Sequence, residues 1–546
     1  MKEELKQIPV LAMYDVRGIQ NFIFSTNRIR DIIGASELVE NIIIEGLEEV
    51  CKQQQWKEDN YIIDWENDKS KVVLGETEGQ LNIENVQMQV LFVGGGNAYV
   101  LFSKGEICEQ VNKLLAKYVL EKTYSLNLAV AVVRKTEDYS VDYANINEEM
   151  RKIKAVMPQV KPMGAFPFMA IDSVTGYPLA TYDKSGKEYI STEAYLKRAK
   201  IPNIDDANYA DKILDNMVTQ KGEDSMLAVV HIDGNGMGSR IKKIMQDKKL
   251  YKDAIIIMRS ISMYLKDEFM YCYKKMCDAI DKIAPKVKGT SFEGKLYRKI
   301  IVAGDDITFI CNDKVALYAV KVFLDEVSKK VMYKDPELLE EENKKKYALS
   351  ACAGVAFFNS HFPFSDAYEV AESCCSSAKR MAKKEENKAN GDKEGIIGCY
   401  VDYQICHHIN AANLGTYREK QYRLFDAKPL PKESVWNNQL MVQRPYYVAG
   451  TGYVGVLDIN ERNENKRRNM DEVLWKNLRI FHSTDSGKSR YKKLRNAFSL
   501  GMTDVENEIA FLESRQIPLP DKGEQNELVL TWYDSLELVD ICELGE

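Results

Sequence analysis

The sequence predicts an α+β protein built from two ferredoxin-like β-α-β-β-α-β units, a connecting segment and a helical C-terminal domain. Three observations lead to this prediction. Short apolar, β-branched runs that end at glycine alternate with longer segments of helical periodicity. The order strand, helix, hairpin, helix, strand, helix occurs twice along the chain. The two predicted hairpin turns also align without a gap, because residues 93–98 match residues 302–307.

The first copy begins with an apolar strand over residues 10–15 that turns into a helical segment. Arg28, Arg30 and Asp31 lie on that segment, and a second amphipathic helix is predicted from about Glu37 to Gln54. The spacing of apolar residues then changes between periods of two and 3.6 residues. The remaining elements are a strand, its hairpin partner, a helix, a strand and a charged helix, predicted at 88–93, 98–102, 106–124, 126–133 and 145–156.

The second copy repeats this order with longer helices. Its predicted elements are a strand, long helices, a hairpin, a helix, a strand and a closing helix, at 227–233, 239–283, 300–311, 315–333, 348–358 and 365–384. A duplicated unit within one chain is the simplest account of the two series.

Four domains follow from these elements. We expect a first unit over 1–160, a linker or knuckle over 161–222, a second unit over 223–410 and a mostly helical domain over 411–546. Residues 162–202 are rich in Pro and Gly and have too few apolar side chains for a core of their own. The charge run at 337–346 predicts a solvated loop, and 424–448 also predicts a loop.

The composition is that of an ordinary water-soluble protein and excludes several classes. The net charge of −7 gives no overall electrostatic signature of nucleic-acid binding. The eleven cysteines are scattered without a Cys-x-x-Cys pair, which favours reduced thiols over disulfides or a zinc site. No apolar run approaches the roughly 20 residues that span a bilayer, and the charged N-terminus lacks a secretion signal. None of the five histidines is followed by aspartate, so a histidine-aspartate phosphohydrolase is unsupported. We expect a cytoplasmic protein without a membrane partner.

Carboxylates follow the two central strands of the second copy. Asp233 ends an apolar run, and Asp305 and Asp306 lie in the predicted hairpin turn. Phosphoryl transfer from a nucleotide needs divalent cations, and Mg²⁺ prefers one or two carboxylates together with substrate phosphates. We therefore predict these three aspartates as catalytic metal ligands. The alternative is two ordinary turns, since Asp-Gly turns are common.

Glycines surround the predicted carboxylates. Backbone amides approach a triphosphate closely only where side chains are absent, and the N-terminus of a following helix favours anions. The residues predicted to bind phosphates on this basis are Gly234, Asn235, Gly236, Met237 and Gly238, together with Gly304.

These stretches resemble the large polymerase/cyclase subunit of type III CRISPR effector complexes, a family with two palm domains. Its first palm has segments similar to Gly18–Ile23 and to Gly34-Ala35-Ser36. Its second palm has motifs similar to 233–238 and 303–306, and its helical end domain has a segment similar to 488–498. The similar motifs occur in the same order and extend over most of the chain.

The chain also departs from that family. Members usually begin with a histidine-aspartate nuclease domain, whereas the first palm begins here within about ten residues of Met1, so we expect a shortened or stand-alone relative without DNA cleavage. The family's knuckle uses cysteines, but 172–180 and 189–197 contain none, and we expect no zinc. Ala303 replaces the first glycine of the hairpin motif, a mild change. Gly94-Gly95-Gly96-Asn97 stands where the second palm has its acids, so the first palm is expected to be degenerate, without metal ligands.

The resemblance implies a palm-domain, GGDEF-like nucleotidyltransferase that converts ATP into a cyclic oligoadenylate messenger for antiviral defence. Two Mg²⁺ or Mn²⁺ ions would be held by the three aspartates and the backbone carbonyl of Ile232. Lys379 would neutralise the triphosphate. A second nucleotide would lie against Ser36 and the turn Gly94, Gly95, Gly96 and Asn97, although these glycines are equally consistent with a tight hairpin alone.

Two other functions remain open from the sequence. A catalytically silent scaffold would bind nucleotide or guide RNA through basic clusters at 466–468 and 488–495, which are also consistent with solvated helix faces. A diguanylate-cyclase-like enzyme shares the palm but normally has one palm per chain, and the internal repeat argues against it. The expected partners are ATP or another nucleoside triphosphate, an RNA activator or type III-like complex subunits, and a downstream cyclic-oligonucleotide effector.

Overall fold

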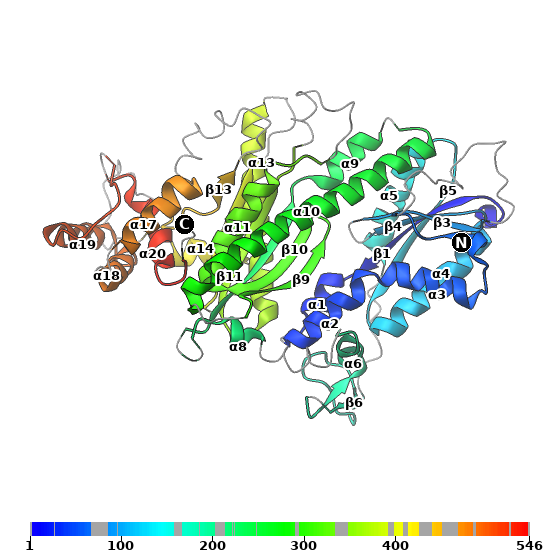
Figure 1. The fold of residues 1–546 in the computed structure, drawn as a ribbon, viewed down its shortest axis with the longest axis horizontal. Helices are drawn as coiled ribbons and strands as arrows, with labels where there is room; N and C mark the ends of the chain where they lie inside the picture. Colours follow the sequence, from blue (N-terminus) through cyan, green and yellow to red (C-terminus); the bar gives the residue numbers. More distant parts are fainter. Residues whose placement is uncertain are drawn as a thin grey trace. The chain divides into compact units, whose positions relative to one another are not determined.

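The structure is a computed structural model, and it confirms the predicted α+β class with mixed sheets (Figure 1). The described residues are 3–26, 28–66, 86–94, 97–157, 166–184, 186–201, 213–220, 222, 224–246, 248–289, 294–332, 348–390, 398–407, 413–424, 439–449, 468–483, 488–523 and 526–543. Contacts divide the chain into two compact units. Unit 1 comprises Met1–Ile213, Gly236–Asp267 and Ile300–Asp306, and unit 2 comprises Leu214–Asn235, Glu268–Lys299 and Ile307–Glu546.

A five-stranded sheet forms the centre of unit 1. Its spatial order is β2 (Tyr61–Ile62), β3 (Met88–Gly94), β4 (Asn97–Phe102), β1 (Val10–Arg17) and β5 (Asn127–Arg134). β1 is antiparallel to β4 and β5, and β3 is antiparallel to β4. With helices after β1 and β4, this arrangement is the one expected for a ferredoxin-like unit.

Helices pack on both faces of this sheet. Their bounds are η1 (Glu3–Leu5), α1 (Ile19–Phe24), α2 (Ile29–Glu40), α3 (Ile42–Gln53), η2 (Glu58–Asn60), α4 (Gly105–Thr123) and α5 (Tyr139–Val156). Figure 1 shows α3 and α4 below the sheet and α5 above it. Tyr14 donates to Asn112 of α4 at 2.6 Å, whereas its neighbour Asp15 contacts Lys154 of α5. Alternate residues of β1 thus face opposite layers, as the pleat of a strand requires.

The knuckle, which we define as the described residues between 166 and 201, is held to α2 by buried charges. It contains the antiparallel strands β6 (Leu179–Asp183) and β7 (Glu188–Ser191) and the helix α6 (Thr192–Ala199). Arg198 binds Asp31 at 2.6 Å, Asp183 at 2.5 Å and Glu188 at 3.1 Å. α6 approaches α2 so closely that a Cβ atom at Gly34 would lie 1.9 Å from a backbone oxygen of α6. Ion pairs and backbone contact therefore attach the knuckle to unit 1.

A six-stranded sheet contains the second predicted unit. Its spatial order is β13 (Tyr446–Ala449), β12 (Cys399–Ile405), β11 (Ala351–Asn359), β8 (Met226–Gly234), β10 (Asp306–Asn312) and β9 (Tyr297–Ala303). β11 is antiparallel to β8 and parallel to β12. The four strands β11, β8, β10 and β9 repeat the order of β5, β1, β4 and β3 in the first sheet.

The other helices of the chain have the following bounds: α8 (Ile213–Met217), α9 (Met237–Met245), α10 (Tyr251–Lys288), α11 (Asp313–Val327), α13 (Phe364–Asn390), α14 (Leu414–Gln421), η5 (Met470–Trp475), α17 (Lys476–His482), α18 (Lys488–Phe498), α19 (Met502–Ser514), η7 (Val529–Thr531) and α20 (Trp532–Leu538). α13 packs on β8, β11 and β12, and α11 packs on the same sheet. The last of these helices, from η5 to α20, lie between residues 470 and 538.

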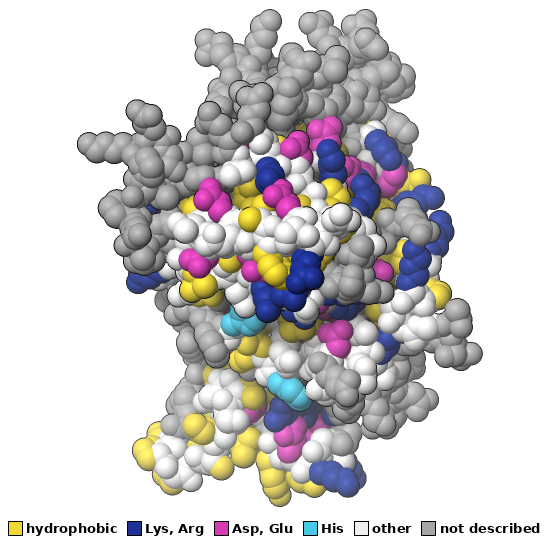
Figure 2. All heavy atoms as spheres, turned by 90° about the vertical axis from the view of Figure 1, so that its left-hand side faces the viewer, with side chains coloured by type: hydrophobic (Ala, Val, Ile, Leu, Met, Phe, Trp, Pro, Cys, Tyr) yellow, Lys and Arg dark blue, Asp and Glu magenta, His cyan; other side chains and the backbone are white. Residues whose placement is uncertain are grey.

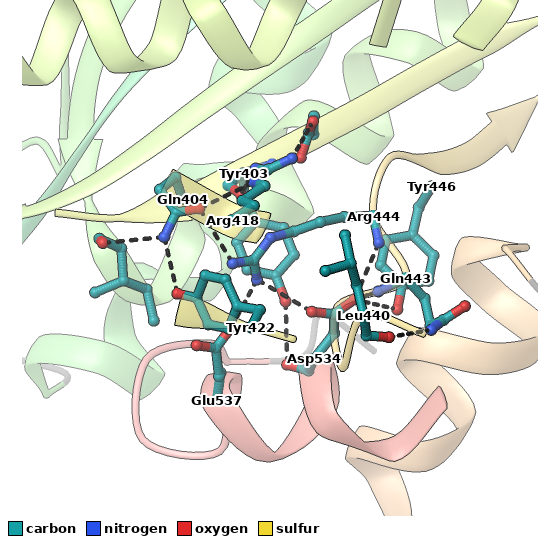
Figure 3. Close-up of polar contacts among 12 residues, drawn as sticks. Tyr403, Gln404, Arg418, Tyr422, Leu440, Gln443, Arg444, Tyr446, Asp534 and Glu537 are labelled. Carbon is teal, nitrogen blue, oxygen red and sulfur yellow. Dashed lines mark hydrogen bonds and ion pairs between the residues drawn. The ribbon is translucent and has the colours of Figure 1, made fainter. Parts of the chain in front are cut away.

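A buried ion network joins α20 to the second sheet (Figure 3). Arg444 is 4% exposed and binds Asp534 at 3.1 Å and Glu537 at 2.6 Å, both on α20. Arg418 of α14 forms a two-pronged pair with Asp402 of β12 at 2.8 and 2.9 Å. Because all three carboxylates and both guanidinium groups are buried, loss of one partner would leave an uncompensated charge.

Two predictions about local structure were wrong. The helix predicted from Glu37 to Gln54 is two helices, α2 and α3, separated at Asn41. The loop predicted over 424–448 contains the start of β13, which pairs with β12. The predicted charged loop at 337–346 lies outside the described residues. None of the helices that the structure describes combines the length and apolar composition needed to cross a lipid bilayer.

Candidate functional site

A cavity of about 840 Å³ lies within unit 1. It opens between the α5 face of the first sheet, the helices α2, α9 and α10, and the turn between β9 and β10. The predicted site residues that line it are Ser36, Gly94, Asn97, Met237, Gly238, Gly304 and Asp305. Residues from four separate stretches of the sequence therefore meet at one hollow.

The β9–β10 turn is shaped by a single left-handed residue. Gly304 has φ +64°, a conformation that favours glycine, and no atom lies within 4 Å of a Cβ built there. Asp305 follows it and lines the cavity, while Asp306 is the first residue of β10. Both acids are half-buried.

The N-terminus of α9 contributes backbone to the same cavity. Gly236 adopts φ +66° as the N-cap, and the helix begins at Met237. Gly238 has open space where a side chain would lie. The first turn of a helix leaves backbone N–H groups without helical partners, so this end is suited to an anion.

Two of the five residues on which a second nucleotide was predicted, Ser36 and Gly94, also have structural contacts. The Ser36 hydroxyl donates to the backbone oxygen of Ile300 on β9. A Cβ atom at Gly94 would lie 2.9 Å from the hydroxyl oxygen of Ser262 on α10, and that hydroxyl donates to Val93 at 2.8 Å. A side chain at Gly94 would displace the Ser262 hydroxyl from its contact with β3. Gly95 and Gly96 lie outside the described residues.

Aromatic rings form an apolar wall of the cavity. Tyr99 stacks on Phe92, with ring centroids 4.6 Å apart, and on Tyr143 at 5.9 Å. The Tyr99 hydroxyl donates to Asn147 at 3.2 Å. Burial raises the pKa of Tyr99 well above its ordinary value, so the hydroxyl stays neutral and remains a donor.

Cationic side chains also reach the cavity, and the sequence analysis did not find them. Arg151 of α5, Lys242 of α9 and Lys266 of α10 all line it. They lie on helices with many other charges, and no local signal separates them from solvated residues. Only the tertiary arrangement brings them to the cavity.

Asp233 lies near the end of β8 and is paired with a lysine within unit 2. Lys379 of α13 donates to the Asp233 carboxylate and to the backbone oxygen of Gly234, the latter at 3.2 Å. Burial lowers the pKa of Lys379, but the hydrogen bond and charge of Asp233 outweigh this effect and raise the pKa overall. The predicted acid and the predicted cation are therefore in direct contact.

Ile232 and Asn235, which flank Asp233 and Gly234 in the sequence, are deeply buried. Ile232 is fully buried and is in register with Ala353 of β11. The Asn235 side chain is 5% exposed and donates to the Ser350 hydroxyl at 3.1 Å and to the Gly398 backbone at 3.4 Å. The Asn235 amide thus holds the end of β8 in unit 2.

Strands β8 and β10 are neighbours in the second sheet. His231 Nδ1 lies 3.2 Å from the hydroxyl oxygen of Thr308. Asp233 follows His231 by two residues on β8, and Asp306 precedes Thr308 by two residues on β10. Burial lowers the pKa of His231 to about 4, so its imidazole is neutral near pH 7.

The first sheet carries a similar acid–lysine pair that the sequence analysis missed. Asp15 of β1 is the register partner of Asn97 on β4. Its carboxylate accepts a hydrogen bond from Lys154 of α5. The available signal was that Asp15 ends an apolar run, as Asp233 does in the second copy.

The donor atoms suit a hard divalent cation completed by a ligand. Among the described residues, no three His, Cys, Asp or Glu side chains lie close enough together to form a metal cage. However, an Asp233 carboxylate oxygen and the Gly234 carbonyl already accept hydrogen bonds from one ammonium group, so they present oxygens to a positive charge. Mg²⁺ is commonly held by one or two carboxylates plus substrate phosphates, and these residues fit that pattern.

Comparison with known proteins gave matches only among solved structures; no protein-family model and no curated protein matches the chain. A crystal structure of a Csm1–Csm4 cassette with cA4 is 12% identical, covers 98% of this chain and 70% of the matched chain, and has a TM-score of 0.40. The cassette with pppApA is 11% identical, covers 98% and 69%, and has a TM-score of 0.45.

A Csm1–Csm4 subcomplex of the type III-A CRISPR–Csm interference complex is 13% identical, covers 99% and 70%, and has a TM-score of 0.40. The structural neighbours are Csm1 subunits of type III-A complexes. The predicted resemblance to this kind of subunit is confirmed. The superpositions are loose, and they assign no role to any residue of this chain.

Proposed function

We propose that this chain is a nucleotidyltransferase that joins ATP molecules into a cyclic oligoadenylate messenger in CRISPR-type antiviral defence, acting in the cytoplasm. The observation that supports this most strongly is the cavity in unit 1, which gathers seven residues that the sequence motifs predicted. Its volume of about 840 Å³ lies within the range of pockets that enclose small organic ligands.

The two kinds of wall in the cavity suit the two ends of a nucleotide. Phe92, Tyr99 and Tyr143 line the cavity with apolar surface, which suits a base. Arg151, Lys242 and the N-terminus of α9 supply positive charge and backbone donors for phosphates.

Asp233, Asp305 and Asp306 would hold two Mg²⁺ or Mn²⁺ ions, with the backbone of Ile232 as a further donor. When bound, such ions stabilise the charge that develops on the attacking and leaving oxygens of phosphoryl transfer. Lys379 would keep positive charge beside the Asp233 carboxylate and offset the triphosphate.

The bond changes are those of a nucleotidyl transfer. The 3′-oxygen of one nucleotide forms a bond to the α-phosphorus of a second, and the bond from that phosphorus to the β-phosphate oxygen breaks. Pyrophosphate leaves, and the hydroxyl proton passes to water. The residues of the chain contribute by orienting both nucleotides, which is a large part of catalysis in such reactions.

Incubation of the purified protein with each radiolabelled nucleoside triphosphate and Mn²⁺ or Mg²⁺ tests the proposal. We expect a cyclic product from ATP that disappears in Asp305→Ala/Asp306→Ala and persists in Asp278→Ala, which removes an exposed acid of α10. Assays with and without added RNA would detect an RNA activator. The absence of product under all conditions would favour the scaffold function. In that case the chain would bind the subunits of a type III-like complex and would make no messenger for a downstream effector.

A further inference from the structure

The knuckle exposes an unusual concentration of large apolar side chains. Thirteen such side chains are exposed in the described part of the chain, and seven of them lie between 166 and 195. They are Phe166, Phe168, Met169, Ile171, Tyr182, Tyr189 and Tyr195. Exposed apolar clusters of this kind mark interaction surfaces, whereas single exposed residues need no explanation. We call this set the aromatic patch.

The rings of the aromatic patch are presented in two pairs. Phe166 and Phe168 are stacked with an interplanar angle of 2° and centroids 5.6 Å apart, and Phe168 is 83% exposed. Tyr182 of β6 and Tyr189 of β7 are register partners with centroids 5.1 Å apart. Figure 2 shows hydrophobic side chains at the bottom of the view, together with basic and a few acidic ones, where Figure 1 labels β6 and α6. These flat faces are therefore open to a ligand.

The acidic side chains of the knuckle are bound to cations or to hydrogen-bond donors. Asp183 binds Arg198 and Glu193 binds Lys197 at 2.7 Å, in pairs that are largely buried. Glu188 is half-buried, and its charge is offset by both Arg28 and Arg198. Asp172 accepts hydrogen bonds from the Ser191 hydroxyl at 2.9 Å and from the backbone of Val174 at 3.0 Å.

The lysines of the hairpin remain at the surface. Lys184 and Lys187 lie in the turn between β6 and β7, and both are exposed. Lys184 is two residues after Tyr182, and Lys187 is two residues before Tyr189. The solvent-facing side of the hairpin is thus aromatic and basic, although the protein as a whole is acidic.

We propose that the aromatic patch with Lys184 and Lys187 is a binding surface for single-stranded RNA. Unpaired bases stack on exposed aromatic faces, and lysines beside the rings contact the phosphates that join those bases. A duplex hides its base faces, so it would use the lysines without the rings. An apolar protein partner would use the rings without needing the lysines, and the charge pattern therefore favours RNA.

Fluorescence anisotropy with the full chain tests this surface. The probe is a labelled RNA of about 20 unpaired nucleotides, longer than the roughly 4–16 nucleotides that a comparable single-strand site covers. We expect Phe168→Ala/Tyr182→Ala/Tyr189→Ala to bind at least roughly tenfold more weakly, since each stacked base contributes substantially. Tyr271→Ala/Leu500→Ala, which removes exposed apolar side chains elsewhere, serves as the matched control.

Salt dependence separates the lysines from the rings. Lys184→Gln/Lys187→Gln should lower the slope of log affinity against log salt by about 1.4, at about 0.7 for each phosphate contact to a single strand. Lys52→Gln/Lys57→Gln, a pair of exposed lysines elsewhere in unit 1, should leave the slope unchanged. A duplex of the same sequence should bind the wild type more weakly than the single strand.

Photocrosslinking of 4-thiouridine RNA to the wild type should label peptides of the knuckle. Equal affinity of the aromatic variant and the wild type, equal binding of duplex and single strand, or crosslinks outside the knuckle would each overturn the proposal. So would a wild type that binds no RNA. Loss of a protein partner in the aromatic variant, with RNA affinity unchanged, would identify the patch as a protein interface instead. All variants change exposed side chains, and thermal unfolding verifies that each is folded.

Discussion

Lys379 of α13 donates a hydrogen bond to the carboxylate of Asp233 near the end of β8. In the first sheet, Lys154 of α5 makes the same contact with Asp15 near the end of β1. Each lysine lies on the helix that follows the fourth strand of its ferredoxin-like unit. The internal repeat therefore extends beyond the strand order to an acid–lysine pair, and the two copies differ mainly at the neighbouring strand.

Replacement of Lys379 tests the role of the pair in the second sheet. Lys379→Ala removes a half-buried positive charge beside a predicted metal ligand, so product formation should fall by about 10²–10³-fold, as for other preorganised charges. Lys379→Arg keeps the charge and should restore part of the activity. The measurement is cyclic product formed from radiolabelled ATP.

Lys383→Ala is the matched control, because Lys383 is exposed on the same helix. If Lys379→Ala loses no more activity than this control, the contact with Asp233 is structural only. Thermal unfolding of both variants verifies that any loss is not a loss of fold.

The difference between the two sheets can be tested at Asn97. Asn97 is the register partner of Asp15, and Asn97→Asp would place a second carboxylate on the adjacent strand. Two nearby carboxylates repel each other, so the variant should be less stable than the wild type without divalent ions. A carboxylate pair also attracts a divalent cation, and binding to the folded state alone raises its stability.

We therefore expect Mn²⁺ to raise the melting temperature of Asn97→Asp more than that of the wild type, measured by thermal unfolding with and without the ion. Asn147→Asp, which adds an acid on α5, controls for the added charge. An equal response of both variants to Mn²⁺ would show that the position on β4 has no special geometry.

Sequence patterns located most elements because their signals are local. β8 extends over Met226–Gly234 against a predicted 227–233, since an apolar run bounded by Asp-Gly defines it without help from the rest of the fold. The break between α2 and α3 at Asn41 was hidden because Ile42, Ile43 and Ile44 continue the apolar character of the helix. β13 was missed because it has only four residues and forms by pairing with β12, far away in the sequence.

The residues of the candidate site also differ in whether a local sequence signal marks them. Asp305 and Gly304 were predicted because a turn between two strands has a recognisable composition, and the structure places both at the cavity. Arg151 and Lys242 gave no signal, because a charged residue on a helix reaches a ligand only through the packing of that helix. The acid–lysine pair of Asp15 was overlooked because its partner lies 139 residues away.

The knuckle provides a test of stability without zinc. Arg198 binds Asp31 and Asp183, which are largely buried, so Arg198→Ala would remove the nearest cation of both carboxylates. Its third partner, Glu188, is half-buried and also binds Arg28. Removal of one partner from a buried ion network typically costs about 3–5 kcal/mol. We expect hydrogen exchange to accelerate in β6, β7, α6 and α2.

Arg198→Lys should be intermediate, because one ammonium group cannot reproduce the fork of a guanidinium group. A chelator such as EDTA should leave hydrogen exchange in β6, β7 and α6 of the wild type unchanged, since the knuckle contains no cysteine ligands. Faster exchange in these elements with EDTA, or normal exchange in Arg198→Ala, would contradict this account.

Asp313 should make unit 2 sensitive to pH. It lies in the first turn of α11 and is 1% exposed. Burial raises the pKa of its carboxyl to about 7, Lys314 opposes this shift and Asp224 adds to it. In the unfolded chain an aspartate titrates near pH 4. The folded state therefore keeps a proton that the unfolded state releases between about pH 4 and pH 7.

The sign of the effect follows from this difference. The folded state binds more protons in that window, so the free energy of unfolding should fall as pH rises from about 4 to 7 and then level off, by up to about 4 kcal/mol from this group. Asp313→Asn has no titrating proton at this position, so its stability should lack this fall between pH 4 and pH 7. The stability of the variant relative to the wild type should therefore rise with pH. Urea unfolding at a series of pH values measures the difference, and Asp278→Asn, an exposed acid of α10, is the control. A difference between Asp313→Asn and the wild type that stays constant from pH 4 to pH 8 would show that Asp313 is ionised in the folded protein.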